Sequence, residues 1–146
     1  GGLLQIHYQL ENLPVGHPLC FAVECNFAAM AAGADDRYFY GPDGGQLGQL
    51  QTVQSLDEIN RIGLVDEWLG VDASLDLSQA GSIWTFPIQT VSQSEGGFEL
   101  VHQSAAVVPR WTIVADDSRQ WGVTIKLTVD TSAAQARELA SAAVNG

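Results

Sequence analysis

The chain has 146 residues and a formal net charge of -11, with 17 acidic and only six basic side chains. A chain of this length forms one domain, which buries about two thirds of the surface of its unfolded state. Because 46% of the residues are hydrophobic and 16% are charged, the composition is that of a globular protein. Nucleic acids and anionic membranes are disfavoured as partners, since both are bound through clustered Lys and Arg side chains.

The sequence contains no segment typical of a membrane protein or of an exported one. Its longest apolar run, residues 27–32, is far shorter than the ~20 residues of a spanning helix. The N-terminus lacks the basic and then apolar pattern of a signal peptide. We therefore expect a cytoplasmic protein, or one whose export signal has been removed.

Alternation of apolar and polar residues predicts strands along the first part of the chain. Residues 4–10 form a half-buried strand with the even-numbered apolar residues on one face. After a turn at residues 15–18, a second strand follows over residues 19–27, and the two form an antiparallel hairpin. Cys20 and Cys25 are separated by an odd number of residues on this strand, so their side chains point apart and no disulfide is expected.

The pattern weakens between residues 46 and 63, where we expect a long connection. Ser55 and Glu58 have the spacing of a helix-capping box, which predicts a short helical turn over residues 55–59. Alternation typical of strands returns beyond this segment. It covers residues 71–77, 84–88, 98–102, 104–108 and 121–129.

The C-terminal 16 residues differ in composition from the rest. They are rich in Ala, with only Leu139 and Val144 as sizeable apolar side chains, which predicts a peripheral tail that is helical or frayed. We therefore divide the chain into residues 1–130, a β domain, and residues 131–146, the tail. Seven to ten short strands with turns between them predict an all-β fold, a sandwich of two antiparallel sheets.

Four tryptophans invite a carbohydrate hypothesis, since an aromatic ring can stack on the apolar face of a sugar. Trp84 and Trp121 alternate in register with apolar neighbours, which favours the core for both. Trp68 and Trp111 lie at a loop and a strand end, so they are the better candidates for sugar contact. Burial in the core or at an interface remains the alternative for these two.

Glycoside hydrolysis needs two carboxyl groups roughly 5–9.5 Å apart. Acidic residues cluster in two polar segments, but nothing in their spacing identifies a catalytic pair, so we assign no catalytic residue. Asp66 and Glu95 could instead accept backbone N–H bonds and hold their loops. The candidates for a carbohydrate or domain-interface role are Asp66, Glu67, Trp68, Gln93, Glu95, Glu99 and Trp111.

Other chemistry finds little support in the sequence. No Cys-x-x-Cys, paired-histidine or EF-hand spacing is present, so we expect no metal and no cofactor. His102 with Glu95 or Glu99 is the one combination that could open a sugar ring by general acid–base catalysis.

Several motifs occur in one order along the chain, over roughly residues 4–129. They are Cys25-Asn26-Phe27-Ala28, Asp36-Arg37-Tyr38-Phe39, Leu64 to Gly70, Trp84 to Glu99, and Ser104 to Trp111. In these motifs the chain resembles the C-terminal β-domain of glycoside hydrolase family 57 α-amylases and 4-α-glucanotransferases. The tail beyond Val129 has no match.

The resemblance implies a sandwich similar to those of sugar mutarotases and lectins, packed against a separate catalytic barrel. The catalytic nucleophile and acid of that family belong to the barrel and have no counterpart here. It therefore implies a noncatalytic domain, with the barrel as partner and contact with an α-glucan or maltooligosaccharide as a further expectation. An autonomous sugar-binding or mutarotase-like sandwich is the alternative. An exposed apolar patch would favour the first, and a polar, Trp-lined groove the second.

Overall fold

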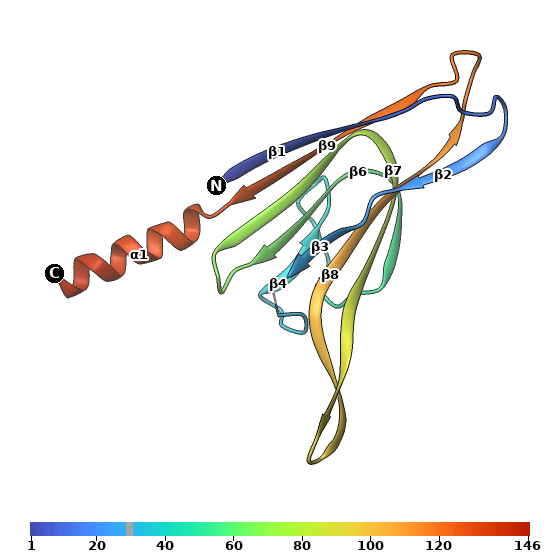
Figure 1. The fold of residues 1–146 in the computed structure, drawn as a ribbon. Helices are drawn as coiled ribbons and strands as arrows, with labels where there is room; N and C mark the ends of the chain where they lie inside the picture. The colour runs from blue at the N-terminus through green and yellow to red at the C-terminus, as the bar shows by residue number, and fades with distance from the viewer. Residues whose placement is uncertain (29–30) are drawn as a thin grey trace.

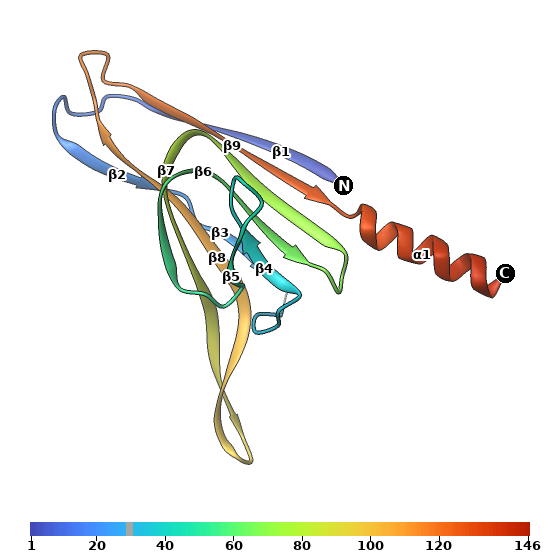
Figure 2. The same cartoon turned by 180° about the vertical axis from the view of Figure 1, so that it is seen from behind.

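A computed structural model describes residues 1–28 and 31–146, so two residues of the apolar run at 27–32 lie outside the described part. The described residues form nine antiparallel strands and one helix (Figures 1 and 2). The elements are β1 (Gly2–Leu10), β2 (Pro18–Ala22), β3 (Cys25–Ala28), β4 (Arg37–Tyr40), β5 (Gln46–Gln49), β6 (Gln54–Asp66), β7 (Val71–Ser94), β8 (Gly97–Val114), β9 (Trp121–Asp130) and α1 (Ser132–Asn145).

The long strands β6 and β7 pass through both layers of the fold. The first half of β7 lies between β9 and the end of β6, and this layer has the order β1-β9-β7-β6-β4-β5. The second half of β7 pairs instead with β8, which also carries β2 and β3 on its other edge. The result is the two-layer, all-β sandwich that the alternation of the sequence predicted (Figure 1).

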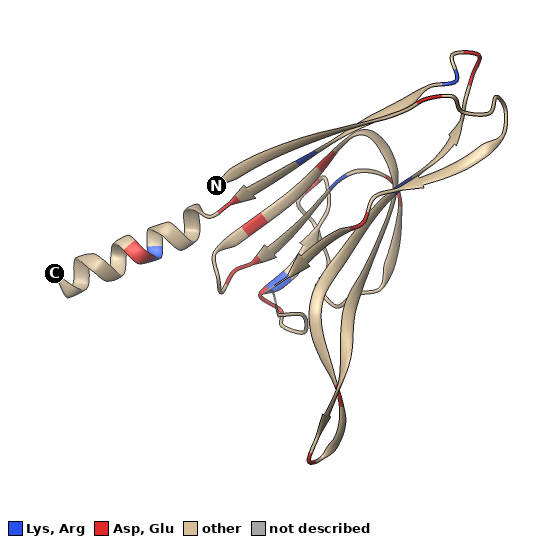
Figure 3. Ribbon diagram, in the orientation of Figure 1, with Lys and Arg blue, Asp and Glu red and all other residues tan. Residues whose placement is uncertain are grey.

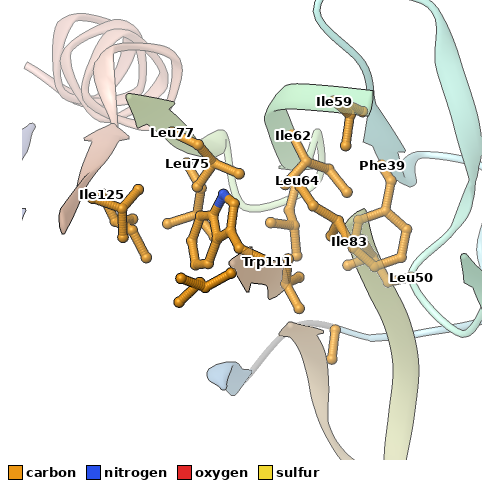
Figure 4. Packing of buried hydrophobic residues seen from close by; sticks show 14 residues of the cluster. Phe39, Leu50, Ile59, Ile62, Leu64, Leu75, Leu77, Ile83, Trp111 and Ile125 are labelled. Atoms are coloured by element: carbon orange, nitrogen blue, oxygen red, sulfur yellow. The ribbon is translucent and has the colours of Figure 1, made fainter. Parts of the chain in front are cut away.

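The core fills the space between the two layers. Its fully buried side chains come from β4, β6, β7, β8 and β9 and from Leu50, which follows β5; they include Phe39, Ile62, Leu64 and Ile125 (Figure 4). An aromatic cluster joins β1 and β9 to β2 and β8. Its members are Tyr8, Phe21, Trp111 and Trp121, whose neighbouring ring centroids are 5.5–6.2 Å apart.

The helical turn expected over residues 55–59 is wrong, because this segment belongs to β6. Its pairing with β7 shifts register on both sides of Ile59, and Glu58 has a positive φ of 51°. This is the geometry of a β-bulge, which places extra residues in one strand. Ser55 therefore pairs with Trp84 in the sheet and caps no helix. A single helical turn is marginal in water, so a ladder of tertiary hydrogen bonds overrides it.

The cysteines, the first hairpin, the C-terminal tail and two tryptophans were also the subject of predictions. Both cysteines are free, as predicted, although they lie on the separate strands β2 and β3. The hairpin expected between residues 4–10 and 19–27 is wrong, because β1 pairs with β9 while β2 and β3 pair with β8. The tail forms helix α1, which has no buried residue; its first turns lie beside the β6–β7 turn, and its C-terminal end extends away from the two layers (Figures 1 and 2). Trp121 packs against the core, whereas Trp84 is 43% exposed on the outer surface under the guanidinium of Arg110, contrary to its expected burial.

The hairpin between β7 and β8 extends beyond the body of the sandwich, where no other strand pairs with it (Figure 1). We call residues 89–103 the β7–β8 arm. Every residue in it except His102 is exposed. A register shift between Ile88 and Gln89 separates the arm from the packed part of the sheet.

Candidate functional site

The seven residues singled out from the sequence lie in three separate places. Asp66, Glu67 and Trp68 lie at the turn between β6 and β7, beside the start of α1. Gln93, Glu95 and Glu99 lie near the tip of the β7–β8 arm. Trp111 lies in the core. The fold thus brings together only residues that were already neighbours in sequence or in a hairpin.

Asp66 holds the β6–β7 turn. Its side chain is 1% exposed, and its Oδ2 accepts a hydrogen bond from Nε of Arg37 at 3.1 Å. Its Oδ1 accepts from the backbone N–H of Leu69 at 2.9 Å. Arg37 also pairs with Asp36 at 3.0 Å. The sequence left two roles open for Asp66, contact with a ligand or interface and stabilisation of its own loop. These contacts show that it stabilises the loop.

Beside this turn, Trp68 is 72% exposed and forms the wall of a surface groove. The groove has a volume of about 690 Å³ and is lined by Asp36, Glu67, Trp68 and Arg137. Arg137 of α1 donates hydrogen bonds to the backbone carbonyls of Glu67 and Trp68. The hydroxyl of Tyr38 donates to Glu67 at 3.1 Å. An open indole ring next to carboxylates and a guanidinium is the kind of surface that can stack on a sugar and satisfy its hydroxyls.

Gly70 allows α1 to lie against this turn. It has a positive φ of 72°, and a Cβ atom built on it would lie 2.5 Å from the backbone nitrogen of Ala134. Only glycine meets both conditions without strain. A second hollow of about 390 Å³ lies here between the end of β6 and the first turns of α1.

The β7–β8 arm carries an apolar face. Val91 lies directly opposite Leu100, and Gln93 opposite Phe98, so these four side chains share one side of the ribbon. Val91, Phe98 and Leu100 are 65%, 77% and 68% exposed. The sequence pattern revealed the strands but gave no sign that this face lies beyond the core. Nothing in an apolar alternation distinguishes a covered face from an uncovered one.

The acidic residues of the arm do not form a reactive group with His102. Glu99 pairs across the ribbon with Ser92, on the side opposite the apolar face, and accepts a hydrogen bond from Ser94 at 3.3 Å. Glu95 lies in the turn at the tip. His102 pairs with Gln89 at the base of the arm, and both of its ring nitrogens are buried without a partner. The combination of His102 with Glu95 or Glu99 that was considered from the sequence is therefore not assembled.

Trp111 is only 5% exposed, so burial is the alternative that the structure shows for it. Its ring stacks on Phe21 with the centroids 6.2 Å apart, and its Nε1 donates to the carbonyl of Gln79 at 3.1 Å. The alternation of Trp111 with Ile113 and Ala115 could have indicated this. Trp111 has no open ring face for a sugar.

The described residues, 1–28 and 31–146, contain no group of three or more His, Cys, Asp or Glu side chains placed to hold a metal ion. Among the same residues, no helix has the length and apolar character needed to cross a bilayer.

A two-layer antiparallel sandwich with a projecting β-hairpin arm defines the class as an all-β domain. Residues 1–125 match the family described as "Alpha-amylase/4-alpha-glucanotransferase, C-terminal". The chain belongs to this family of C-terminal domains.

Individual relatives agree with this assignment. The chain is 28% identical to Alpha-amylase 1 of Dictyoglomus thermophilum over 134 residues, which is 86% of this chain and 18% of that protein. The crystal structure of the 4-alpha-glucanotransferase from Thermococcus litoralis superposes with a TM-score of 0.60 at 19% identity, over 84% of this chain and 16% of the other. Protein Slr1438 of Synechocystis sp. PCC 6803 has a TM-score of 0.54 at 13% identity, over 89% and 51%. The two structures show that the fold is shared, and the chain spans less than a fifth of the amylase.

Proposed function

We propose that this chain is a noncatalytic β-sandwich domain of an α-glucan-acting enzyme, and that it packs on a separate catalytic domain of that enzyme. The observation that carries the proposal is the uncovered apolar face of the β7–β8 arm, because such surfaces mark contacts with a partner. The names of the amylase and glucanotransferase relatives support the substrate class. We expect the enzyme to be cytoplasmic.

The arrangement of the acidic residues also supports a noncatalytic role. Asp66 is engaged with Arg37 and the backbone of its own turn, while Glu95 and Glu99 lie on the distant arm. A glycosidase needs two carboxyls on either side of one bond. The candidates from the sequence do not provide such a pair.

The packing role can be tested on the full-length polypeptide that contains this chain. Removing residues 1–146 from it should leave glucan hydrolysis or transfer measurable but shorten the half-life of the activity on heating. The catalytic groups remain, but the surface that this domain covers becomes exposed. An unchanged half-life would contradict the proposal.

Direct contact with glucan is the finer part of the proposal, and it rests on Trp68 and Glu67. Titration of the 146-residue chain with maltooligosaccharides, followed by NMR, should shift resonances around the β6–β7 turn. Trp68→Ala should weaken this binding. Trp84→Ala is the matched control, because Trp84 is also an exposed indole but lies on the other layer.

Equal affinity of a folded Trp68→Ala variant, or no shift at millimolar ligand, would remove the glucan contact and leave the packing role. Catalytic ring opening of a sugar by the 146-residue chain alone would favour the autonomous, mutarotase-like alternative.

A further inference from the structure

We propose that the apolar face of the β7–β8 arm, formed by Val91, Phe98 and Leu100, docks into a groove of the catalytic domain in the same polypeptide. This inference rests on the proposed function and adds the surface through which it acts. The groove we infer is apolar at its floor and carries Lys or Arg side chains at its rim.

The apolar floor follows from the arm's amphipathic build. Val91, Phe98 and Leu100 gather on one side with Gln93, at 65–77% exposure for the three apolar side chains, while Thr90, Ser92 and Glu99 occupy the other with the less exposed Val101 (39%). On the polar side, Gln103 donates a hydrogen bond to Thr90 at 3.0 Å across the ribbon. An isolated two-stranded ribbon is marginally stable in water, so an arm of this kind gains from a partner that covers its apolar side.

The basic rim follows from the arm's charge. Its carboxylates, Glu95 and Glu99, are not balanced by any Lys or Arg between residues 89 and 103. Figure 3 shows only acidic colour on the arm. Glu99 lies on the side away from the apolar face, whereas Glu95 lies in the turn at the tip. A groove that accepts the arm therefore needs a cation at the part of its rim that meets Glu95, because an unpaired carboxylate loses hydration when a partner approaches.

The small size of the face favours a partner in the same chain. Three side chains cover far less than the roughly 800 Å² per partner of a stable complex between separate proteins. A covalently connected domain is present at an effective concentration near the millimolar range, so a small patch is enough. The curated amylase relative has the necessary length, since this chain matches only 18% of it.

Size argues against a second copy of this chain as the occupant. Two arms laid face to face would bury only the three apolar side chains of each, far less than a stable complex between separate chains needs. A second copy also lacks the effective concentration that a covalent connection provides.

Photo-crosslinking of the full-length polypeptide tests the inference. Phe98 is replaced by p-benzoylphenylalanine, the protein is irradiated, and the cross-linked peptides are identified by mass spectrometry. We expect a cross-link within one polypeptide, from residue 98 to a segment of the catalytic domain that contains Lys or Arg near apolar residues. The same probe at Ser92, on the polar side of the arm, is the control and should give at least tenfold less of that product.

A matched pair of variants gives a second readout. Val91→Ser and Val114→Ser remove the same apolar group from positions that are 65% and 60% exposed, but only Val91 lies on the arm. In the full-length enzyme, Val91→Ser should shorten the half-life of glucan activity at elevated temperature several-fold, and Val114→Ser should leave it unchanged. Equal effects of the two variants would overturn the inference.

The outcomes separate the two proposals. A cross-link from residue 98 to a second copy, or none at all, overturns the docking role of the arm. In that case a shorter half-life after removal of residues 1–146 would still support the packing role. If the full-length polypeptide has no catalytic domain, both the packing role and the docking role of the arm are rejected.

Discussion

The contact between Arg37 and Asp66 shows how a single buried ion pair can fix a turn. Asp66 is 1% exposed and Arg37 17%, whereas the similar pair of Arg61 and Asp76 is 41% and 30% exposed. The N–O distance is 3.1 Å in both pairs. The contribution of each pair to the free energy of unfolding therefore depends on its burial, because removing one partner of a buried pair leaves an uncompensated charge.

We expect Asp66→Ala to lower the free energy of unfolding by about 3 kcal/mol, since Arg37 loses a buried partner and the backbone N–H of Leu69 loses its acceptor. Asp76→Ala is the control and should cost less than about 1 kcal/mol, as is usual for exposed pairs. Urea unfolding of the two variants measures the difference. Equal losses would show that the buried pair does not stabilise the turn.

Gly63 and Tyr40 form a second unit at the scale of single residues. They are direct partners across β4 and β6, and a Cβ atom on Gly63 would lie inside the Tyr40 ring. The ring thus lies flat over the glycine, and its hydroxyl donates to Asp72 of β7 at 2.7 Å. An aromatic side chain that covers a cross-strand glycine compensates for the missing side chain.

We expect Gly63→Ala to cost about 2 kcal/mol, because the new methyl group displaces the Tyr40 ring and breaks its hydrogen bond. Gly2→Ala is a suitable control, since nothing lies within 4 Å of the position of its new Cβ. Thermal unfolding would compare the two. A Gly63→Ala variant as stable as Gly2→Ala would mean that the ring is free to move.

The same tyrosine gives a dependence on pH. Burial, and then the hydrogen bond to Asp72, raise the pKa of Tyr40 above its ordinary value of 10.0. A raised pKa in the folded state means that the stabilisation is complete below about pH 10 and is lost as the pH rises through the folded-state value. Between about pH 9 and 11, Tyr40→Phe should lose less stability than the unmodified chain. Urea unfolding of both proteins at the two pH values tests this. Equal losses of stability in the two proteins would show that Tyr40 is not the group responsible.

Among the elements, helix α1 contributes least to the packed structure. It has no buried residue, and its side chains reach the sandwich through Arg137, which binds the carbonyls of Glu67 and Trp68. The division into residues 1–130 and 131–146 remains a prediction, and this geometry favours it.

Truncation after Asp130 should therefore lower the free energy of unfolding by no more than about 1 kcal/mol, the range of changes at a surface. Arg137→Ala should account for most of that loss. Calorimetric unfolding of both forms would check this. Collapse of the truncated chain to an unfolded state would show that the tail belongs to the domain.

The strands also show which features of the fold can be predicted from the sequence pattern. Alternation located strands such as β1 and β9, in parts of which every second residue is less exposed. It missed β5 and most of β6, because residues 46–63 were expected to form a long connection. It missed the β6 bulge at Glu58, since a positive φ there is imposed by pairing with β7 and leaves no mark on composition. The exposed arm was read as an ordinary strand, because its Leu100 alternates like a core residue.

For the whole molecule, the resemblance predicted the family, whereas the candidate site was predicted only in pieces. Glu67 and Trp68 border a groove, but the contribution of Arg137 depends on a long-range contact between α1 and the β6–β7 turn. Residues so far apart in sequence are brought together only by the fold.

The proposed packing of this sandwich on a catalytic domain is tested most directly by scanning calorimetry of the full-length polypeptide and of the isolated 146-residue chain. If the domains stabilise each other, the transition of residues 1–146 lies higher in the full-length protein, by about 2–4 °C for each kcal/mol of contact. The same transition temperature in both samples would contradict the packing role.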